Sequence, residues 1–508
     1  MRPSAGPAVL AFALCVAAVS AAPASLLPAA FAKDKAPEVS AGERDFLAGY
    51  TSDDGAARAK AVDRLHDAPE PVRLQLVASR VIPKEKRADV LARAVEVLAR
   101  IKDETVVEKL VATSRSGPPE QRCLYVEALA SMQGSTAAHR ALLEFVKDKE
   151  TWVRAMAAFS LGEHRAMDAF DPLLACLNDK MWQVQSAALA ALPRLSEKET
   201  LKTKAVPKLV DYLENSSGRQ RDDCADALKR ITGRNLGKDA DVWRKWIAGG
   251  DAATAPAAPA APEAKPAPAP GAPTGGDYGN QESAEKPHFY GIEVTSTRIV
   301  VVLDRSLSMN DPITIDRERL RRETSRRRAA VTGENAPKDD KTPPEDVGYD
   351  IPWWRIKTKL DLARYQTINL LSRLAPEQNF ELILFSNEVE PWMNRLVPAT
   401  QANKQKAIQV VETLKPDGET NTWGALAAAF EMSASATRTG PGAPDEIYFV
   451  TDGQPSKGDI LDGNQIYEAV VQLAKVHQMR VNVIGIGVNL TFLRKIAVIT
   501  GGQYKSFE

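Results

Sequence analysis

Apolar and polar positions follow two different patterns along the 508 residues of this chain. From about residue 41 to residue 249, apolar side chains recur at helical spacing among Ala, Leu, Val and charged residues, without strand-like alternation. A pentapeptide pattern that ends in leucine repeats within this part, as in AVDRL at Ala61–Leu65 and ALAAL at Ala188–Leu192. The leucines that close these pentapeptides are Leu65, Leu98, Leu129, Leu161, Leu192 and Leu228.

The spacing of these leucines predicts a helical repeat domain. Successive leucines are 33, 31, 32, 31 and 36 residues apart, and a period in this range is typical of stacked two-helix units. One helical hairpin cannot bury its apolar face alone, so neighbouring hairpins share it. The pattern resembles short bacterial HEAT-like repeats over most of residues 41–235. The resemblance implies an α-solenoid that offers a binding surface and no chemistry; an irregular helical bundle is the alternative.

From His288 onward, short apolar runs alternate with amphipathic segments, which predicts an α/β domain over residues 288–508. The predicted strands are Arg298–Leu303, Phe380–Ser386, Glu446–Thr451 and Val481–Gly485. The predicted helices are Lys357–Leu374, Ala402–Leu414, Trp423–Ala436, Gln465–Gln478 and Leu490–Thr500. Wholly apolar strands that alternate with helices indicate a doubly wound parallel sheet covered on both faces. In such sheets the ligand site lies beyond the carboxyl ends of the strands.

Two further segments define the ends of the helical repeat domain, which we place at residues 41–249. Residues 252–273 are almost entirely Ala and Pro and cannot build a core, so we expect residues 250–287 to form an extended linker that lets the two halves move independently. Residues 1–32 have the features of a signal peptide: Arg2, the apolar run Ala8–Ala22, and the small-x-small sequence Ala30-Phe31-Ala32. An uncleaved membrane anchor is the alternative.

These segments predict an exported protein, located in the periplasm or cell envelope or outside the cell, with no membrane span in the mature chain. The 66 basic and 66 acidic residues cancel, so nothing in the charge favours nucleic acid. Cys123, Cys176 and Cys224 lie in apolar helical contexts, and their spacing fits no zinc site. The five histidines are scattered, which weakens the case for a centre built on histidine.

Polar side chains follow the predicted strands at the edge where a ligand site is expected. We call them the five candidate ligands: Asp304, Ser306, Ser308, Thr420 and Asp452. They supply two carboxylates and three hydroxyls, which are hard oxygen ligands suited to Mg²⁺, with Mn²⁺ or Ca²⁺ as alternatives. Two acidic groups alone bind such an ion weakly, so an open coordination position would accept a carboxylate from a partner. The alternative is that these side chains only cap helices and turns.

The same motifs resemble a von Willebrand factor type A domain with a metal-ion-dependent adhesion site, as found in exported bacterial proteins. The resemblance runs from about Phe289 to Phe507 and includes the Asp-x-Ser-x-Ser sequence, GETNTWGAL, VTDG and the terminal VNVIGIGVNLTFLRKIAVITGGQY. It implies a Rossmann-like fold in which the three hydroxyls among the candidate ligands touch the ion directly. The two carboxylates would act largely through water, and an acidic residue of a partner would complete the coordination shell.

The chain departs from this pattern at two places. Leu307 stands where typical bacterial members have glycine, at a position that is not a ligand. An insertion between Met309 and Trp353, which we place at residues 311–352, includes the basic stretch Arg317–Arg328. We expect this insertion to form a rim or a lid at the metal face that selects or excludes ligands, and its basic residues to attract an acidic partner. The alternative is a solvated helix followed by a loop.

The sequence therefore favours a noncatalytic interaction protein, in which the metal site recognises an acidic residue of one partner while the helical repeats dock a second. A structural scaffold with a vestigial metal site is one alternative. A hydrolase that uses Ser306 or Ser308 as nucleophile is another, but a nucleophilic serine needs a nearby base. His477 lies within a predicted helix, and no Gly-x-Ser-x-Gly sequence surrounds either serine.

Overall fold

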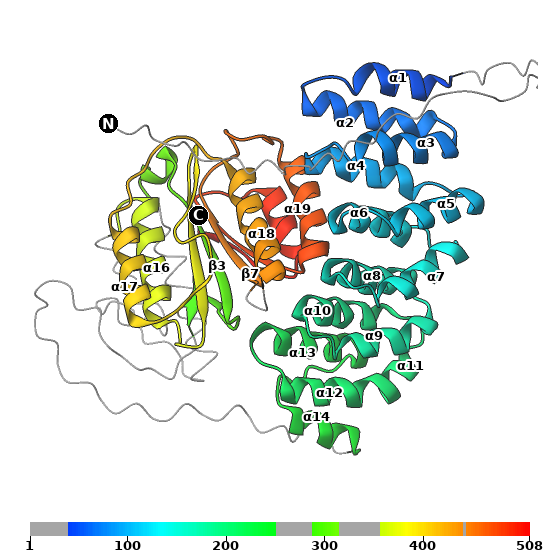
Figure 1. The fold of residues 1–508 in the computed structure, drawn as a ribbon. Coiled ribbons are helices and arrows are strands. Elements are labelled where there is room, and N and C mark those ends of the chain that lie inside the picture. The colour runs from blue at the N-terminus through cyan, green and yellow to red at the C-terminus, as the bar shows by residue number, and fades with distance from the viewer. Residues whose placement is uncertain (1–38, 250–286, 314–355, 440–442, 508) are drawn as a thin grey trace, which may run out of the picture.

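The computed structural model describes residues 39–249, 287–313, 356–439 and 443–507. The predicted signal peptide, nearly all of the linker, and residues 314–355, which include most of the insertion, lie outside the described residues. The described chain forms a row of paired helices on one side and an α/β domain on the other (Figure 1).

The row of paired helices, called the array below, shares one hydrophobic core. Its inner helices stack in sequence, α4 on α6, α6 on α8 and α8 on α10. All six leucines of the repeating pentapeptide are fully buried, which confirms the predicted helical repeats. The α-helices are α1 (Ala41–Gly49), α2 (Gly55–Asp63), α3 (Glu70–Leu76), α4 (Ala88–Ala99), α5 (Glu104–Ser114), α6 (Pro119–Ala130), α7 (Thr136–Phe145), α8 (Thr151–His164), α9 (Phe170–Cys176), α10 (Trp182–Ala191), α11 (Lys198–Thr200), α12 (Val206–Asn215), α13 (Gly218–Thr232) and α14 (Ala240–Ile247).

Polar contacts join successive repeats at equivalent positions. The Glu70 carboxylate accepts hydrogen bonds from the backbone N–H groups of Lys102 and Asp103, next to the start of α5. One repeat later, the Glu104 carboxylate accepts a bond of 2.8 Å from the backbone N–H of Ala137 in α7. Free N–H groups at the starts of helices need such acceptors. The repeat period therefore places each of these glutamates beside the start of a helix in the following repeat. The three cysteines of the array are free and buried, in agreement with their apolar helical sequence contexts.

The α/β domain is built on a seven-stranded sheet with the order β5-β4-β3-β7-β8-β9, and β6 also pairs with β4. Five strands run parallel: β3 (Arg298–Asp304), β4 (Asn379–Phe385), β7 (Glu446–Thr451), β8 (Arg480–Ile486) and β9 (Tyr504–Phe507). The prediction of a wholly parallel sheet was incomplete, because β5 (Val389–Pro391) and β6 (Val397–Pro398) pair antiparallel along the outer edge of β4. Short connections, such as the one from β4 to β5, permit only antiparallel pairing.

Helices cover both faces of this sheet, as predicted. Ile299, Val301 and Leu303 of β3 face the side covered by α16 (Lys359–Arg373) and α17 (Gln401–Glu412). Val300 and Val302 face the other side, which carries the helices α18 (Thr422–Thr439), α19 (Gly463–His477) and α20 (Thr491–Ile499). A hairpin of β1 (His288–Phe289) and β2 (Ile292–Glu293) precedes the sheet.

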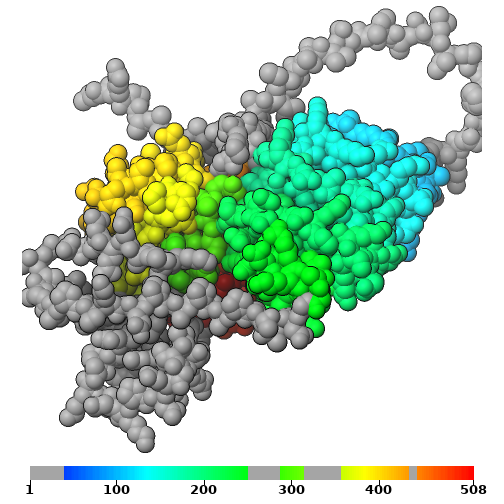
Figure 2. Space-filling model, turned by 90° about the horizontal axis from the view of Figure 1, so that it is seen from below, coloured from blue at the N-terminus to red at the C-terminus, as the bar shows by residue number. Residues whose placement is uncertain are grey.

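The array packs directly against the α/β domain, so the expectation that the two halves move independently was wrong for the described residues. Helix α19 contacts α4 and α8, and the two parts touch in the space-filling view (Figure 2). The Lys475 ammonium of α19 pairs with the Glu127 carboxylate of α6 at 2.6 Å. Near the amino ends of the strands, Arg480 pairs with Asp223 of α13 at 2.7 Å. The interface thus extends along α19 and holds the two parts in one arrangement.

Candidate metal centre

The five candidate ligands lie at the carboxyl edge of the sheet. Asp304 is the last residue of β3, and the two candidate serines lie in or beside the turn that follows it. Asp452 comes directly after β7, which pairs with β3 in parallel register, so the two strand ends are neighbours. Thr420 lies just before α18. The apolar strands therefore bring three separate polar stretches of the sequence to one edge.

Four of these side chains converge around Gly453. The Ser306 and Ser308 hydroxyl oxygens are 3.1 Å apart, and Ser308 donates a hydrogen bond of 2.7 Å to Asp452 Oδ1. A Cβ atom placed on Gly453 would lie 3.0 Å from Thr420 Oγ1 and 3.6 Å from Ser308 Oγ. Any side chain at residue 453 would therefore enter the space between the hydroxyls, and glycine keeps that space open.

Asp304 is fully buried behind this cluster. Its Oδ1 accepts a hydrogen bond of 2.8 Å from the Ser306 backbone N–H, and its Oδ2 accepts one of 2.6 Å from the Thr451 hydroxyl. Burial outweighs these hydrogen bonds and raises the pKa of Asp304 to about 6. A buried carboxylate in this state is stabilised in its charged form by a nearby cation, which fits a metal site.

Lys359, at the start of α16, supplies a positive charge to the same edge. Its ammonium lies 2.7 Å from Asp452 Oδ2 and 3.4 Å from Asp311 Oδ2. Burial acts to lower the pKa of Lys359, but its contacts with the two carboxylates outweigh burial and raise that pKa. Gly487, at φ +71°, makes room for this side chain, since an added Cβ would lie 3.2 Å from Lys359 Cε.

Sequence reasoning assigned no role to Thr451 or Lys359. Thr451 directly precedes Asp452, so its position beside the strand end was a usable signal. Lys359 had no such signal in the sequence, because the insertion separates this residue from the turn that carries Ser306 and Ser308. The structure closes that separation with an isolated bridge between Pro312 and Thr358 and a hydrogen bond of 3.1 Å from the Lys359 N–H to the Asp311 carbonyl. The predicted rim itself lies outside the described residues.

The donor set fits a hard divalent cation. Within residues 39–249, 287–313, 356–439 and 443–507, no group of three or more His, Cys, Asp or Glu side chains is placed to hold a metal. The edge described above instead combines two carboxylates with three hydroxyls, which is the oxygen chemistry that Mg²⁺ accepts while keeping some of its water. The five candidate ligands could hold such an ion.

Comparisons with known proteins agree with this architecture. Residues 367–506 match a family model described as von Willebrand factor type A domain, and residues 139–229 match one described as HEAT repeats. The first match begins after the insertion, so the parallel pairing of β3 with β4 and β7 is what joins the serine turn to the matched region.

Curated relatives align with only part of this chain. Mouse inter alpha-trypsin inhibitor heavy chain 4 is 32% identical over 149 residues, which are 28% of this chain and 16% of that protein. Inter-alpha-trypsin inhibitor heavy chain H1 of Mesocricetus auratus is 34% identical over 115 residues, which are 22% of this chain and 12% of that protein. The chain therefore spans less than a fifth of the length of these relatives.

Solved structures resemble part of this chain at low sequence identity. A von Willebrand factor type A structure from Catenulispora acidiphila is 18% identical, with 42% of this chain and 40% of that chain covered at a TM-score of 0.29. The manganese-loaded TRAP protein of Plasmodium vivax is also 18% identical, with 39% and 61% covered at a TM-score of 0.25. In the part of the chain that the structure describes, no helix has the length and apolarity to cross a bilayer. The chain thus consists of an N-terminal helical repeat region followed by a von Willebrand factor type A domain with a Rossmann-like fold.

Proposed function

We propose that this chain is a noncatalytic, exported protein that binds a divalent cation at the carboxyl edge of its sheet and uses it to coordinate an acidic residue of a partner protein. The observation that carries the proposal is the run of contacts from Ser306 through Ser308 to Asp452, beside the space that Gly453 leaves open. The matched type A domain supports a role in protein interaction.

Each candidate ligand has a role in this proposal. The three hydroxyls would hold the ion directly, while Asp304 and Asp452 would act largely through water. A bound ion, Mg²⁺ in the first instance, would offer an open coordination position to an outside carboxylate. Because α4 and α8 contact α19 of the same chain, a second partner would dock on surfaces of the array outside this interface.

A serine hydrolase finds no support in the geometry. Ser308 donates its hydrogen bond to the Asp452 carboxylate, which Lys359 also contacts, and no histidine of the described residues hydrogen-bonds to this serine. His477 lies at the end of α19, with its ring 5.3 Å from that of Trp152 and 6.0 Å from that of Phe430. Burial lowers the pKa of His477 to about 4, and its place in the domain interface indicates a packing role.

We expect Thr420→Val to weaken Mg²⁺ and Mn²⁺ binding by about tenfold or more, because it removes a ligand hydroxyl at nearly constant volume. Isothermal titration calorimetry of the full chain measures this loss. Thr422→Val is the matched control, since the buried Thr422 hydroxyl has no hydrogen-bond partner among the described residues. A wild-type chain that gives neither heat nor a thermal shift with either ion would contradict the proposal and favour a scaffold with a vestigial site.

The partner is tested by Mg²⁺-dependent capture from the native cell envelope. Binding through the ion predicts that capture by the wild-type chain is lost in chelator and with Asp304→Ala, and is kept with Thr422→Val. Capture that persists in chelator would place the partner on another surface.

We expect Lys359→Met to strengthen Mg²⁺ binding by about tenfold, because the ammonium on Asp452 would repel an ion held by the same carboxylate. Calorimetric titration against wild type measures the change, and Lys357→Met, an exposed lysine two residues earlier, is the matched control. Weaker binding by Lys359→Met would show instead that this lysine orients Asp452 as a ligand.

A further inference from the structure

One loop links the candidate metal centre to the array. This metal-site loop, residues 452–462, begins with Asp452 and leads from β7 into α19. The backbone N–H groups of Ser456 and Lys457 donate to the Thr420 carbonyl at 3.0 and 3.2 Å. The Thr420 N–H donates in turn to Ser456 Oγ at 3.0 Å. The loop therefore carries one candidate ligand and holds the backbone of another.

The same loop passes tightly over the start of α18. Gly458 has φ +104°, and a Cβ atom on it would lie 2.1 Å from Asn421 Oδ1. Asn421 is itself fixed, since its Oδ1 accepts a hydrogen bond from the Gly424 N–H at 2.9 Å and its backbone N–H donates to the Ser386 carbonyl. A shift of residue 459 would therefore be passed back along the loop toward Thr420 and Asp452, because the packed segment between them has little room to absorb it.

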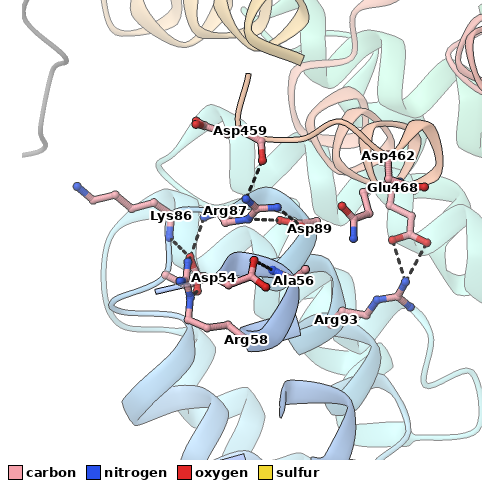
Figure 3. A network of polar contacts seen from close by, with 12 residues as sticks. Asp54, Ala56, Arg58, Lys86, Arg87, Asp89, Arg93, Asp459, Asp462 and Glu468 are labelled. Atoms are coloured by element: carbon pink, nitrogen blue, oxygen red, sulfur yellow. Dashed lines mark hydrogen bonds and ion pairs between the residues drawn. The ribbon is translucent and has the colours of Figure 1, made fainter. Parts of the chain in front are cut away.

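Arg87 of the array holds the far part of this loop. Its Nη1 donates a hydrogen bond of 2.8 Å to the Asp459 carbonyl, as Figure 3 shows. Two further nitrogens of the same guanidinium bind the buried Asp89 carboxylate at 3.1 and 2.9 Å. A bidentate pair of this kind fixes the plane of the guanidinium, so the remaining donor points at Asp459 without a search through rotamers.

The array leaves space for the Arg87 side chain. A Cβ atom on Gly55, at the start of α2, would lie 2.1 Å from Arg87 Nε, so only glycine leaves space for the guanidinium there. Beyond the loop, Arg93 of α4 pairs with Glu468 of α19 through contacts of 3.1 and 3.0 Å (Figure 3). Ala88, next to Arg87, packs against the core of the α/β domain. The contact at Arg87 is therefore part of a built interface.

We propose that Arg87 is a positioning residue of the metal centre, supplied by the helical repeats: it holds the Asp459 carbonyl and thereby keeps the metal-site loop in the conformation that brings Thr420 and Asp452 together. This inference rests on the proposed function of the site. A site whose ligands are held in place before the ion arrives binds more tightly, since less ordering accompanies binding. The affinity of the metal centre then depends on a residue from outside its own domain.

The test compares Arg87→Ala with wild type in the full chain. We expect the dissociation constant for Mn²⁺, measured by calorimetry, to rise about tenfold, and amide hydrogen exchange at residues 452–459 to become faster without any metal. Arg87→Lys, which keeps one donor, should recover part of both losses. Arg244→Ala, which removes exposed ion pairs with Glu214 and Asp241 at the far end of the array, should match wild type.

A second variant separates positioning of the loop from general loosening of the interface. Arg93→Ala removes the ion pair to Glu468 outside the loop and should leave the Mn²⁺ dissociation constant within about twofold of wild type. Equal losses with Arg93→Ala and Arg87→Ala would overturn the proposal, as would wild-type affinity and exchange in Arg87→Ala. If the wild-type chain binds no Mn²⁺, the proposed function fails, and the exchange rates alone decide whether Arg87 holds the loop.

Discussion

Replacing Asp304 with asparagine is expected to make the metal-free chain more stable at neutral pH and to abolish its stabilisation by Mg²⁺. The Asp304 carboxylate is fully buried, and burial raises its pKa to about 6. A charge held away from water without a cation costs free energy. Asparagine keeps the shape and removes the charge, and the Thr451 hydroxyl can accept as well as donate.

The size and the pH dependence of this effect follow from the raised pKa. The folded value of about 6 lies about two units above the ordinary value of 3.8, which amounts to a cost of about 3 kcal/mol in the metal-free chain at pH 7. As the pH falls below 6, Asp304 takes up a proton in the folded state and the cost shrinks. It disappears below about 3.8, so wild type and Asp304→Asn should converge in stability on acidification.

Thermal unfolding at pH 7 with and without Mg²⁺ measures both effects. Without the ion the midpoint of Asp304→Asn should exceed that of wild type; with saturating ion only wild type should gain stability, because a ligand stabilises the state that binds it. Asp417→Asn is the control, as Asp417 is exposed at the same edge and 3.8 Å from Arg305. Equal stabilisation of wild type and Asp304→Asn by Mg²⁺ would remove Asp304 from the site.

The second large effect concerns the contact between the array and the α/β domain. We expect Lys475→Ala to destabilise the docked arrangement by about 3 to 5 kcal/mol, the usual result of leaving a buried charge without its partner. Glu127 is 5% exposed, and burial raises the pKa of Glu127 while the Lys475 ammonium at 2.6 Å lowers it. Removing the ammonium leaves that carboxylate buried in the interface without its cation.

A double variant tests this explanation. Glu127→Gln combined with Lys475→Met removes both charges and should recover most of the stability that Lys475→Ala loses. Small-angle scattering should show a larger radius of gyration for Lys475→Ala than for wild type or the double variant. Lys208→Ala, at an exposed position of α12, is the control. Wild-type stability and dimensions in Lys475→Ala would show that the interface does not depend on this pair.

Features with a strong local pattern could be predicted from the sequence. The leucine period predicted the repeats because every one of those leucines is buried. The apolar strands β3 and β7 predicted where Asp304 and Asp452 would meet, since parallel neighbours end at the same edge. The edge strands were missed because β5 has only three residues and β6 only two, and because β9 is half-buried throughout, so its side chains do not alternate clearly.

Features that depend on distant pairs could not be predicted in this way. Arg87, Lys475 and Asp223 have the sequence character of ordinary surface charges, and only the fold shows that each meets a residue of the other part. The Ala- and Pro-rich linker suggested that the array and the α/β domain move independently. The composition of a linker, however, carries no information about whether the surfaces of the two parts fit each other. Lys359 was missed for a similar reason, because its contact with Asp452 spans 93 residues.

The course of the interface along α19 has a mechanical consequence. The array contacts the α/β domain at both edges of the sheet. Arg87 binds the Asp459 carbonyl near the carboxyl ends of the strands, and Asp223 of α13 binds Arg480 at the opposite edge. A pull on a carboxylate held at the metal centre, resisted through the last helices of the array, would run roughly along the strands. Such a load would act in shear on the contacts of Arg87, Lys475 and Arg480 at the same time, so these contacts would not break one after another.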